Sequence, residues 1–355
     1  MKDLREYSLD ELKMILSDLG LADFRAKQLF EWIHKKNIFT LEEAHNLGKE
    51  TITKLRQAGY DLPQMSCLKA LISKDGQTEK YLLQLSDGET IECVLMHYDG
   101  DFAKKRYSFC ISSQVGCAMG CEFCATGKQG LTRQLTLGEI LAQVYWVNRK
   151  LSKSNDRVGN IVFMGMGEPF HNYDNLIKSI HRLNDELGAS ISQRRMTVST
   201  CGLAPKIRAF ADLELEVGLA ISLHEVDNPS RSALMPINQT YPLEVLIQAC
   251  QYYQEKTKKR LSFEYALASQ VNVSKEKAMA LSRYLQNLDC HINLIPINAV
   301  DERFQKPTKK EIYQFLHLLE SNGLKVSIRQ EKGGDIEGAC GQLKSAYKGI
   351  SNHEN

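Results

Sequence analysis

The second half of this chain alternates between short apolar segments and amphipathic segments, and this alternation restricts the possible folds more than any other feature. Strand-like apolar runs occur at residues 108–112, 160–164, 196–200, 217–223, 261–267, 291–296 and 325–329. Helical periodicity fills the intervals, at residues 137–150, 173–187, 205–211, 243–255, 275–288 and 309–322. Strands joined through helices become parallel neighbours with right-handed crossovers. The pattern predicts an α/β barrel or partial barrel, with its chemistry at the mouth formed by the carboxyl ends of the strands.

Residues 1–60 have the pattern of a small helical domain. Ser8 followed by Glu11 is a capping box, which predicts the start of a helix that Gly20 ends. Further helices are predicted over residues 22–34 and 41–57. Three short amphipathic helices can share one apolar core, so we expect a compact all-α domain in front of the barrel.

Residues 66–97 change to strand-like periodicity. Three apolar runs are separated by Asp75-Gly76 and by Asp87-Gly88, and Asp-Gly between such runs is a hairpin signal. The sequence therefore predicts a small antiparallel β-meander. We divide the chain into a helical domain (1–60), a β-meander linker (61–103), a core barrel (104–346) and a tail (347–355).

The composition is that of a globular protein from a reducing compartment. The 355 residues are 43% hydrophobic and 25% charged, with a net charge of +2, which excludes a disordered chain and a strongly basic one. No apolar run reaches the ~18–20 residues that span a bilayer, and the charged N-terminus lacks the apolar core of a secretory signal. We expect a cytoplasmic protein with no membrane partner, in which ten cysteines need no disulfide framework.

Three of the ten cysteines fall within eight residues, directly after the strand that ends near Ser112. Cys117, Cys121 and Cys124 would therefore lie on a loop at the barrel mouth. An iron–sulfur cube needs an outer ligand on each of four irons, so three cysteines leave one iron open for a substrate. The alternatives are three buried thiols, or a zinc knuckle that takes its fourth ligand from elsewhere.

The residues around these cysteines resemble a known family. Cys-x-x-x-Cys-x-x-Cys in the first barrel loop resembles the signature of radical S-adenosylmethionine (SAM) enzymes, and residues 112–130 resemble the RlmN/Cfr group of RNA adenine methyltransferases. The resemblance implies a radical SAM partial (β/α)6 TIM-type barrel with an RNA-binding N-terminal helical domain. It also implies a [4Fe-4S] cluster on Cys117, Cys121 and Cys124, and two SAM molecules per turnover.

Polar residues follow several of the predicted strands, where a barrel mouth needs hydrogen-bonding groups. Gly167-Glu168 ends the second strand, and Glu168 could hold the ammonium of a methionyl group, although Gly-Glu at a strand end is often only a turn. The resemblance places both residues in the cofactor site. It implies cofactor contacts at further strand ends as well, each of which could instead be a satisfied loop or cap residue: Ser199, Ser222, Leu223, His224 and Asn298.

Two isolated cysteines and a glutamate match the family's catalytic residues. By composition alone, Cys110 and Cys340 would be small buried hydrophobic residues, but glycines surround Cys340 and suit a loop that reaches into a site. The resemblance implies that Cys340 becomes methylated and carries the methyl carbon to adenine, and that Cys110 then releases the product through a transient disulfide. Glu92 matches the proposed general base, with Glu89 as the competing choice on the opposite face of the strand.

The resemblance implies an enzyme that methylates C2 of a specific adenine in 23S rRNA, with tRNA as a further substrate. Gly167-Glu-Pro-Phe and the long N-terminus favour this C2 group, whereas Cys201 stands where many relatives have serine. Two alternatives remain open: C8 methylation of the same adenine, as in Cfr enzymes that confer antibiotic resistance, and a radical SAM enzyme that acts on a non-RNA substrate. An electron donor such as flavodoxin or ferredoxin and a monomeric state are expected.

Basic residues cluster at four places in the sequence and could form an RNA-binding groove if they share one side of the fold. These clusters are residues 104–106, 194–195, 256–260 and 306–310. Because adenine must leave its stack to reach the barrel mouth, unpaired RNA loops are the expected targets.

Overall fold

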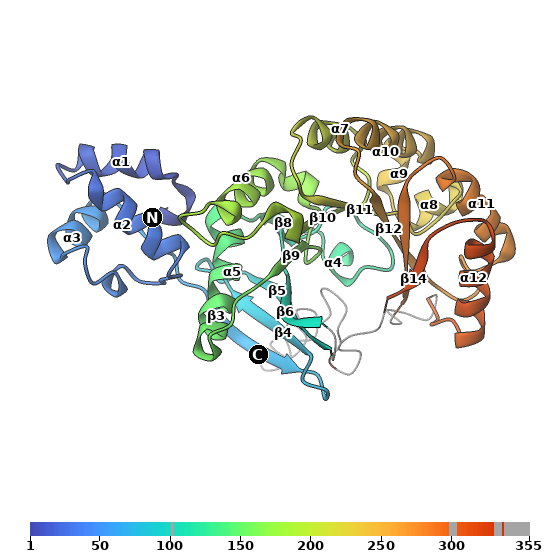
Figure 1. The fold of residues 1–355 in the computed structure, drawn as a ribbon, viewed down its shortest axis with the longest axis horizontal. Helices are drawn as coiled ribbons and strands as arrows, with labels where there is room; N and C mark the ends of the chain where they lie inside the picture. Colours follow the sequence, from blue (N-terminus) through green and yellow to red (C-terminus); the bar gives the residue numbers. More distant parts are fainter. Residues whose placement is uncertain (101–102, 298–303, 330–335, 337–355) are drawn as a thin grey trace.

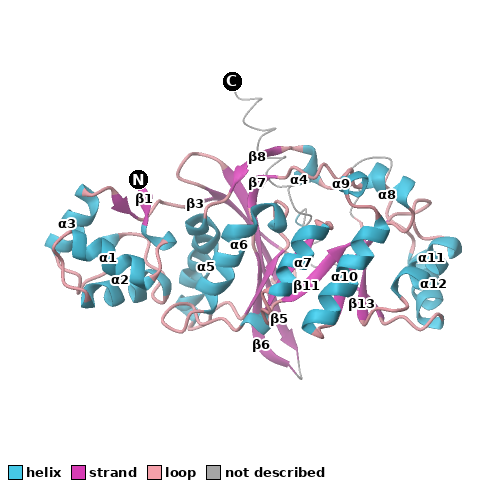
Figure 2. Cartoon of the chain, turned by 90° about the horizontal axis from the view of Figure 1, so that it is seen from above, coloured by secondary structure: helices cyan, strands magenta, loops and turns pink. Residues whose placement is uncertain are grey.

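The computed structural model describes residues 1–100, 103–297, 304–329 and 336 of the chain. Figure 1 shows an elongated molecule, with the N-terminal helices at one end and helices α11 (Lys275–Leu285) and α12 (Lys309–Ser321) at the other. A single large β-sheet runs through the middle, and Figure 2 shows helices packed along it. In the described part of the chain, no helix is long and apolar enough to cross a bilayer.

Ten strands form the sheet, in the order β14-β13-β12-β11-β10-β9-β6-β5-β4-β3. From β6 to β14 every neighbouring pair is parallel, which confirms the predicted barrel-type crossovers. These parallel strands are β6 (Ala103–Cys110), β9 (Asn160–Phe163), β10 (Met196–Thr200), β11 (Gly218–Ser222), β12 (Leu261–Leu267), β13 (Cys290–Pro296) and β14 (Val326–Ile328).

The six predicted crossover helices are present. They are α5 (Leu137–Leu151), α6 (Tyr173–Asn184), α7 (Ala204–Asp212), α10 (Leu243–Thr257), α11 (Lys275–Leu285) and α12 (Lys309–Ser321). The structure adds two short helices that the periodicity did not indicate, α8 (Asn228–Leu234) and α9 (Ile237–Thr240), between β11 and α10. Both are too short to show a helical period in sequence.

The predicted meander is antiparallel, as expected, but it extends the barrel sheet. Its strands are β3 (Ser66–Ile72), β4 (Thr78–Gln84) and β5 (Thr90–Gly100), and β5 pairs with β6 along most of its length. Residues of β4 and β5 therefore share a face with the residues of the barrel interior. After β6 the chain forms a short hairpin of β7 (Gln114–Gly116) and β8 (Leu131–Gln134). The loop between these two strands contains the helical turn α4 (Ala125–Lys128).

The N-terminal domain contains α1 (Leu9–Asp18) and α2 (Phe24–His34), and the predicted capping box of Ser8 and Glu11 is formed. The single helix predicted over residues 41–57 is wrong. The chain forms a 3₁₀ turn at Leu41–Glu43 and then starts α3 (Lys49–Gln57) after Gly48, whose φ of +78° no right-handed helix allows. Two short strands, β1 (Lys2–Asp3) and β2 (Tyr60–Asp61), pair in parallel and close the domain.

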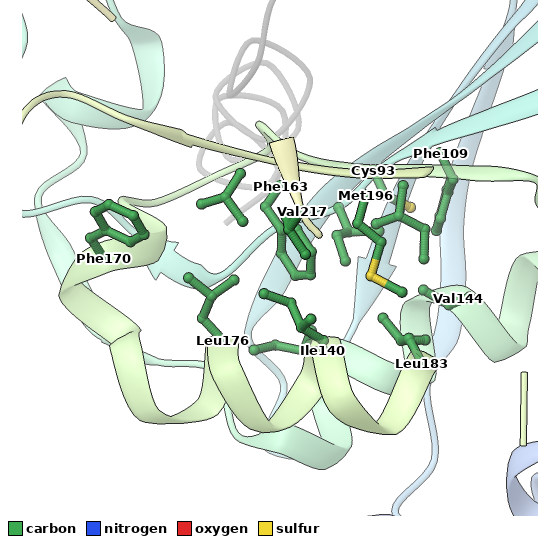
Figure 3. Close-up of a cluster of buried hydrophobic side chains, with 14 of the residues drawn as sticks. Cys93, Phe109, Ile140, Val144, Phe163, Phe170, Leu176, Leu183, Met196 and Val217 are labelled. Carbon is green, nitrogen blue, oxygen red and sulfur yellow. The ribbon is translucent and has the colours of Figure 1, made fainter. Parts of the chain in front are cut away.

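The main hydrophobic core extends from the N-terminal helices along the sheet and the helices that cover it, and part of it lies between the sheet and helices α5 and α6. In Figure 3, Ile140 and Val144 of α5 and Leu183 of α6 point toward Phe109 and Phe163 of the sheet. All five side chains are fully buried. Because residues alternate in a strand, this packing of odd-numbered residues in β6 and β9 leaves the even-numbered ones on the inner face of the partial barrel.

Candidate active site

The three-cysteine loop leaves the sheet at the mouth, between β7 and α4. Cys117 and Cys121 are buried, and Cys124 is half-buried. Gly116 has a φ of +79°, and a Cβ atom there would lie 1.9 Å from the carbonyl oxygen of Gly130. Only glycine can therefore start this loop, since any side chain would break the hairpin that closes it.

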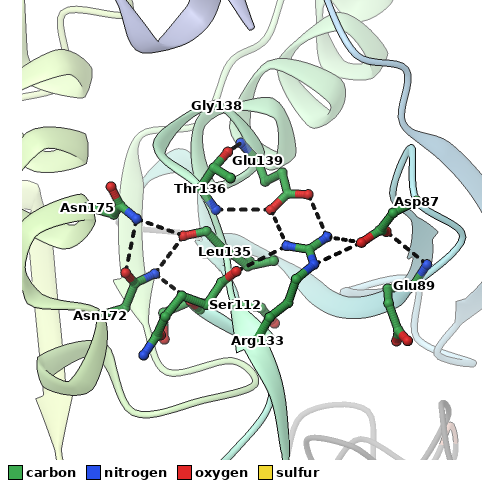
Figure 4. A network of polar contacts seen from close by, with 12 residues as sticks. Asp87, Glu89, Ser112, Arg133, Leu135, Thr136, Gly138, Glu139, Asn172 and Asn175 are labelled. Atoms are coloured by element: carbon green, nitrogen blue, oxygen red, sulfur yellow. Dashed lines mark hydrogen bonds and ion pairs between the residues drawn. The ribbon is translucent and has the colours of Figure 1, made fainter. Parts of the chain in front are cut away.

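A polar network fixes the base of the loop to the surrounding elements (Figure 4). Arg133 in β8 binds Glu139 at the start of α5, and it also binds Asp87 in the turn between β4 and β5. Asn172 donates to the carbonyl oxygens of Ser113 and Leu135. Three separate parts of the chain thus hold the hairpin in one position.

The electrostatics of the cysteine loop suit a bound cationic centre. Burial raises the pKa of the Cys117 thiol to about 12, and it raises the pKa of Cys121, where the neighbouring thiols Cys124 and Cys117 act in the same direction. Thiolates in such a place need positive charge, which iron supplies. The donor set therefore fits an iron–sulfur cluster.

No three His, Cys, Asp or Glu side chains among the described residues lie close enough to hold a single metal ion. Tetrahedral structural zinc takes four protein ligands, whereas a four-iron cluster held by three cysteines keeps one iron open for a further ligand.

Beside the loop, the segment after β9 packs its backbone against β7. A Cβ atom on Gly165 would lie 2.6 Å from the carbonyl oxygen of Ile111, and one on Gly167 would lie 2.5 Å from the Gln114 side chain. Gly167 also has a φ of +102°. Both positions therefore require glycine. The buried Gln114 amide oxygen accepts from the backbone N–H of Glu168 at 2.7 Å and holds this residue in place.

Glu168 points toward the end of the neighbouring strand β10. Its carboxylate accepts from the backbone N–H groups of Phe170 at 3.0 Å and Cys201 at 2.8 Å. Burial raises the pKa of Glu168, and these hydrogen bonds oppose that shift. Each carboxylate oxygen has a second lone pair, so Glu168 can still accept from the ammonium group of a ligand.

Ser199 and Ser222 lie side by side on the inner face, with their Oγ atoms 3.3 Å apart. Leu223 is different, because its side chain is buried in the main core. The side chain is therefore not available for the cofactor contact that the sequence predicted. The backbone N–H of Leu223 donates to the backbone carbonyl oxygen of Glu264, and its carbonyl oxygen accepts from Arg231.

His224 has a positive φ of +59° and a buried ring that lies 4.8 Å from the ring of Phe123 in the cysteine loop. Its Nδ1 accepts from the backbone N–H of Ala266 at 3.0 Å. Burial lowers the pKa of His224 to about 3, so the ring is neutral at pH 7. The proton then lies on Nε2, which leaves one N–H donor to offer to a ligand.

Sequence reasoning missed Arg231 in α8, which is fully buried beneath these strand ends. Its guanidinium donates to the carbonyl oxygens of Cys201, Ser222 and Leu223 at 2.9, 3.2 and 3.1 Å. It is also the positive charge that lowers the pKa of Cys121 against burial. No sequence signal marks it, because arginine in a short polar helix is usually exposed.

A second set of inward residues was also missed. Glu264, Asn293 and Ser327 are in register on β12, β13 and β14, and they form a chain of hydrogen bonds of 2.9 and 3.1 Å. Burial raises the pKa of Glu264. The sequence signal for this set was a glutamate and an asparagine that interrupt otherwise apolar strands at inward-facing positions.

The candidate catalytic residues of β5 and β6 lie on the inner face. Cys110 ends β6, and burial raises the pKa of its thiol to about 11. Glu92 is buried and forms an ion pair with the buried Lys80 at 3.0 Å. The competing residue Glu89 precedes β5 and is half-buried in a turn. Cys340 and Asn298 lie outside the described residues.

Three of the four basic clusters lie at the edge of the sheet opposite the mouth. Residues 104–106 begin β6, residues 194–195 precede β10 and residues 256–260 precede β12, so parallel strands carry all three to the amino-terminal edge. Several of these cations are paired: Arg194 and Lys259 lie 3.2 and 3.5 Å from Glu216. They do not form a groove along the mouth, and only the cluster at residues 306–310 follows a strand on that side.

Comparison with known proteins gives matches over nearly the whole chain. Residues 111–281 match the radical SAM superfamily, and residues 2–60 match the ribosomal RNA large subunit methyltransferase N-terminal domain. A probable dual-specificity RNA methyltransferase RlmN from Clostridium perfringens is 46% identical over 98% of both chains. One of the same name from Lachnoclostridium phytofermentans is 46% identical over 97% of this chain and 95% of its own.

A solved structure is also similar. The crystal structure of a radical SAM methyltransferase from Sphaerobacter thermophilus matches with a TM-score of 0.91 and 39% identity, over 96% of this chain and 99% of that one. The similarity therefore extends over the N-terminal domain, the meander and the barrel together.

Proposed function

Because the chain belongs to the RlmN family of radical SAM RNA methyltransferases, we propose that it methylates C2 of a specific adenine in 23S rRNA and also acts on tRNA. The observation that carries the proposal is one inner face that presents the cysteine loop, the strand-end polar residues and Cys110 together. The relatives' description as dual-specificity enzymes supports two RNA substrates.

Each cofactor has a set of residues that fits it. Cys117, Cys121 and Cys124 would bind a [4Fe-4S] cluster, whose open iron would take SAM. When bound, the cluster supplies the electron that cleaves SAM, and two SAM molecules are consumed per turnover. Further residues would hold SAM at the mouth: Gly167, Glu168, Ser199, Ser222, Leu223, His224 and Asn298.

Individual groups of the chain have separate tasks in binding SAM. The Glu168 carboxylate can accept from the methionyl ammonium, while the Nε2–H of His224 and the hydroxyls of Ser199 and Ser222 can donate to the nucleoside part. Gly167 allows the backbone to pass close to the ligand.

The chemistry on RNA belongs to two thiols and one carboxylate. An aromatic C–H carbon of adenine has no lone pair with which to take a methyl group from a sulfonium. Cys340 would therefore carry the methyl carbon as an S-methyl group. Once a hydrogen atom is taken from this group by the radical that the bound cofactors would supply, its carbon would bond to the ring, and the ring would lose one proton to Glu92 and one electron to the cofactors. The Cys110 sulfur would then attack the Cys340 sulfur: an S–S bond forms, the S–C bond breaks with its electron pair on the carbon, and that carbon takes up a proton to become the methyl group of the product.

The proposed function also implies partners and a location. The enzyme needs a one-electron donor such as flavodoxin or ferredoxin, and it meets ribosomal RNA in the cytoplasm, where the catalytic disulfide is reduced again. We propose that it acts as a monomer.

Mass spectrometry of RNA reacted with anaerobically reconstituted enzyme tests the proposal. We expect 2-methyladenosine in 23S rRNA fragments and in tRNA, whereas 8-methyladenosine would assign C8 and unmodified RNA would reject the activity. We further expect Cys110→Ala to trap a covalent protein–RNA adduct that Cys340→Ala does not form. Absence of the adduct from both variants would contradict the two-thiol route.

A further inference from the structure

A lysine and a glutamate form a buried ion pair on the inner face of the sheet. The Nζ atom of Lys80 lies 3.0 Å from a carboxylate oxygen of Glu92, and neither side chain is more than 2% exposed. Removing two charges from water is costly, and an apolar pair of similar volume is often at least as stable. Stability alone therefore does not account for this pair.

Strand pairing places the ion pair beside Cys110. Lys80 lies directly opposite Val94 in the β4–β5 ladder, and Val94 lies directly opposite Cys110 in the β5–β6 ladder. Residues directly opposite one another point to the same face of a sheet. Glu92 is two residues from Val94 along β5, so it points to that face as well. Lys80, Glu92 and Cys110 thus share one patch of the inner face.

We propose that Lys80 is a positioning residue, whose ammonium group holds the Glu92 carboxylate in place beside Cys110 so that it can accept a proton. The inference rests on the proposed function, since the proton comes from the adenine ring. In that step the ring C–H bond breaks, its electron pair stays in the ring, and an O–H bond forms on Glu92. A general base must lie within hydrogen-bond reach of the proton that it accepts, so a carboxylate fixed by an ion pair is better placed for this step than a mobile one.

The other charged and titratable groups around the patch act on Cys110 and its neighbours. Arg329, which follows β14, lowers the pKa of Cys110, as does Lys80, while Glu92 raises it. Cys93 lies on the opposite face of β5, where burial keeps its thiol protonated. Of the described residues, Lys80 is the cation in direct contact with Glu92.

Removing the lysine charge tests the proposal. The variants are Lys80→Met, Lys80→Arg, Glu92→Gln and the double variant Lys80→Met/Glu92→Gln, with Lys80→Gln as a second neutral variant should methionine prevent folding. Lys105→Met is the matched control, because it removes an ion pair with Asp156 at the far end of β6. Two quantities are measured with anaerobically reconstituted protein: the rate of single-turnover methylation at saturating RNA, and the RNA concentration that gives half of that rate.

We expect Lys80→Met to slow single-turnover methylation about tenfold or more at an unchanged half-saturating RNA concentration, because the base is displaced while RNA binding is not affected. Lys80→Arg should restore most of the rate, and Lys105→Met should match the wild type. The double variant should be no slower than Glu92→Gln, because Lys80 acts only through Glu92.

A wild-type rate in Lys80→Met, or a double variant clearly slower than Glu92→Gln, would overturn the role of Lys80. Failure of the wild type to methylate RNA would instead reject the proposed function.

Discussion

At the scale of single residues, the site depends on buried charged and polar groups that hold the ligand-binding residues in place from beneath. Arg231 satisfies three strand-end carbonyl oxygens, and Gln114 holds the backbone of Glu168. Such groups are costly to bury unless every donor finds an acceptor. Their loss should therefore affect folding and cofactor content more than the reaction itself.

Replacing one of the three proposed cluster ligands should remove the cluster while leaving the fold intact. We expect Cys121→Ala to contain little iron after anaerobic reconstitution, because two cysteines cannot hold a cube that needs three protein ligands. Iron analysis and the visible absorption spectrum measure this. Cys201→Ser is the control, since Cys201 is a nearby buried thiol outside the ligand set, and it should retain its iron. Full cluster content in Cys121→Ala would contradict the assignment.

Replacing the buried arginine should cost stability. Arg231→Met removes the hydrogen bonds that the guanidinium donates to three buried carbonyl oxygens, so we expect the free energy of unfolding to fall by about 3 kcal/mol. Chemical denaturation measures the loss. Arg194→Met, which removes an exposed pair with Glu216, should change stability by no more than about 0.5 kcal/mol. Equal stability of the two variants would show that Arg231 is dispensable.

At the scale of elements, tight glycine turns at the strand ends bring the cysteine loop and the Glu168 segment together. Gly116 and Gly167 both have positive φ values, and both meet other parts of the chain where a Cβ would stand. A turn glycine without such a neighbour, such as Gly76, gives only conformational freedom. The difference separates glycines that build the site from glycines that merely turn the chain.

Substitution of these two kinds of glycine should have different consequences. Gly167→Ala places a Cβ atom 2.5 Å from Gln114, so the Glu168 segment must move, and we expect SAM affinity to fall at least about tenfold. Gly76→Ala strains only an exposed turn and should cost about 1 kcal/mol of stability with unchanged SAM binding. Calorimetric titration of reconstituted protein distinguishes them, and equal affinities would refute the close-packing argument.

At the scale of the whole molecule, a polar contact joins the N-terminal domain to the helices that cover the sheet. His34 of α2 is fully buried, with Nδ1 2.6 Å from the hydroxyl of Tyr145 in α5. Its Nε2 lies 3.0 Å from Arg182 of α6, which also donates to the carbonyl oxygens of Arg5 and Tyr7. The N-terminal domain is therefore fixed to the barrel by groups that must stay satisfied.

This contact makes stability depend on pH. Burial lowers the pKa of His34 well below 6.5, and the charge of Arg182 adds to the shift. The unfolded chain binds a proton below pH 6.5 and the folded chain does not, so stability is present above that pH and is lost as the pH falls. His224 acts in the same direction. Each histidine should contribute about 1.4 kcal/mol per pH unit within this window.

Denaturation of the wild type and of His34→Gln between pH 7.5 and 5.5 measures the effect. Glutamine keeps one donor and one acceptor but does not titrate, so the pH slope of the variant should be smaller by about 1.4 kcal/mol per unit at the acid end. If His34 were instead protonated in the folded state, the free energy of unfolding would depend on pH equally in the two proteins, and the prediction would be wrong.

Local sequence patterns were sufficient to predict the order of the elements and to single out the proposed cluster ligands. The strand–helix alternation gave parallel strands because βαβ units allow few other arrangements, and Ser8 with Glu11 marked a helix start because capping is a local interaction. Cys117, Cys121 and Cys124 stood out because their spacing is short and local.

Contacts between residues far apart in sequence could be seen only in the tertiary structure. The ion pair of Lys80 with Glu92, the burial of Arg231 and the extension of the sheet by the meander all depend on strand register, which joins residues far apart in sequence. Three of the four basic clusters lie at the edge opposite the mouth because parallel strands carry their preceding residues to one side. Local patterns contain no information on such long-range pairing, since register is set by packing of the whole sheet.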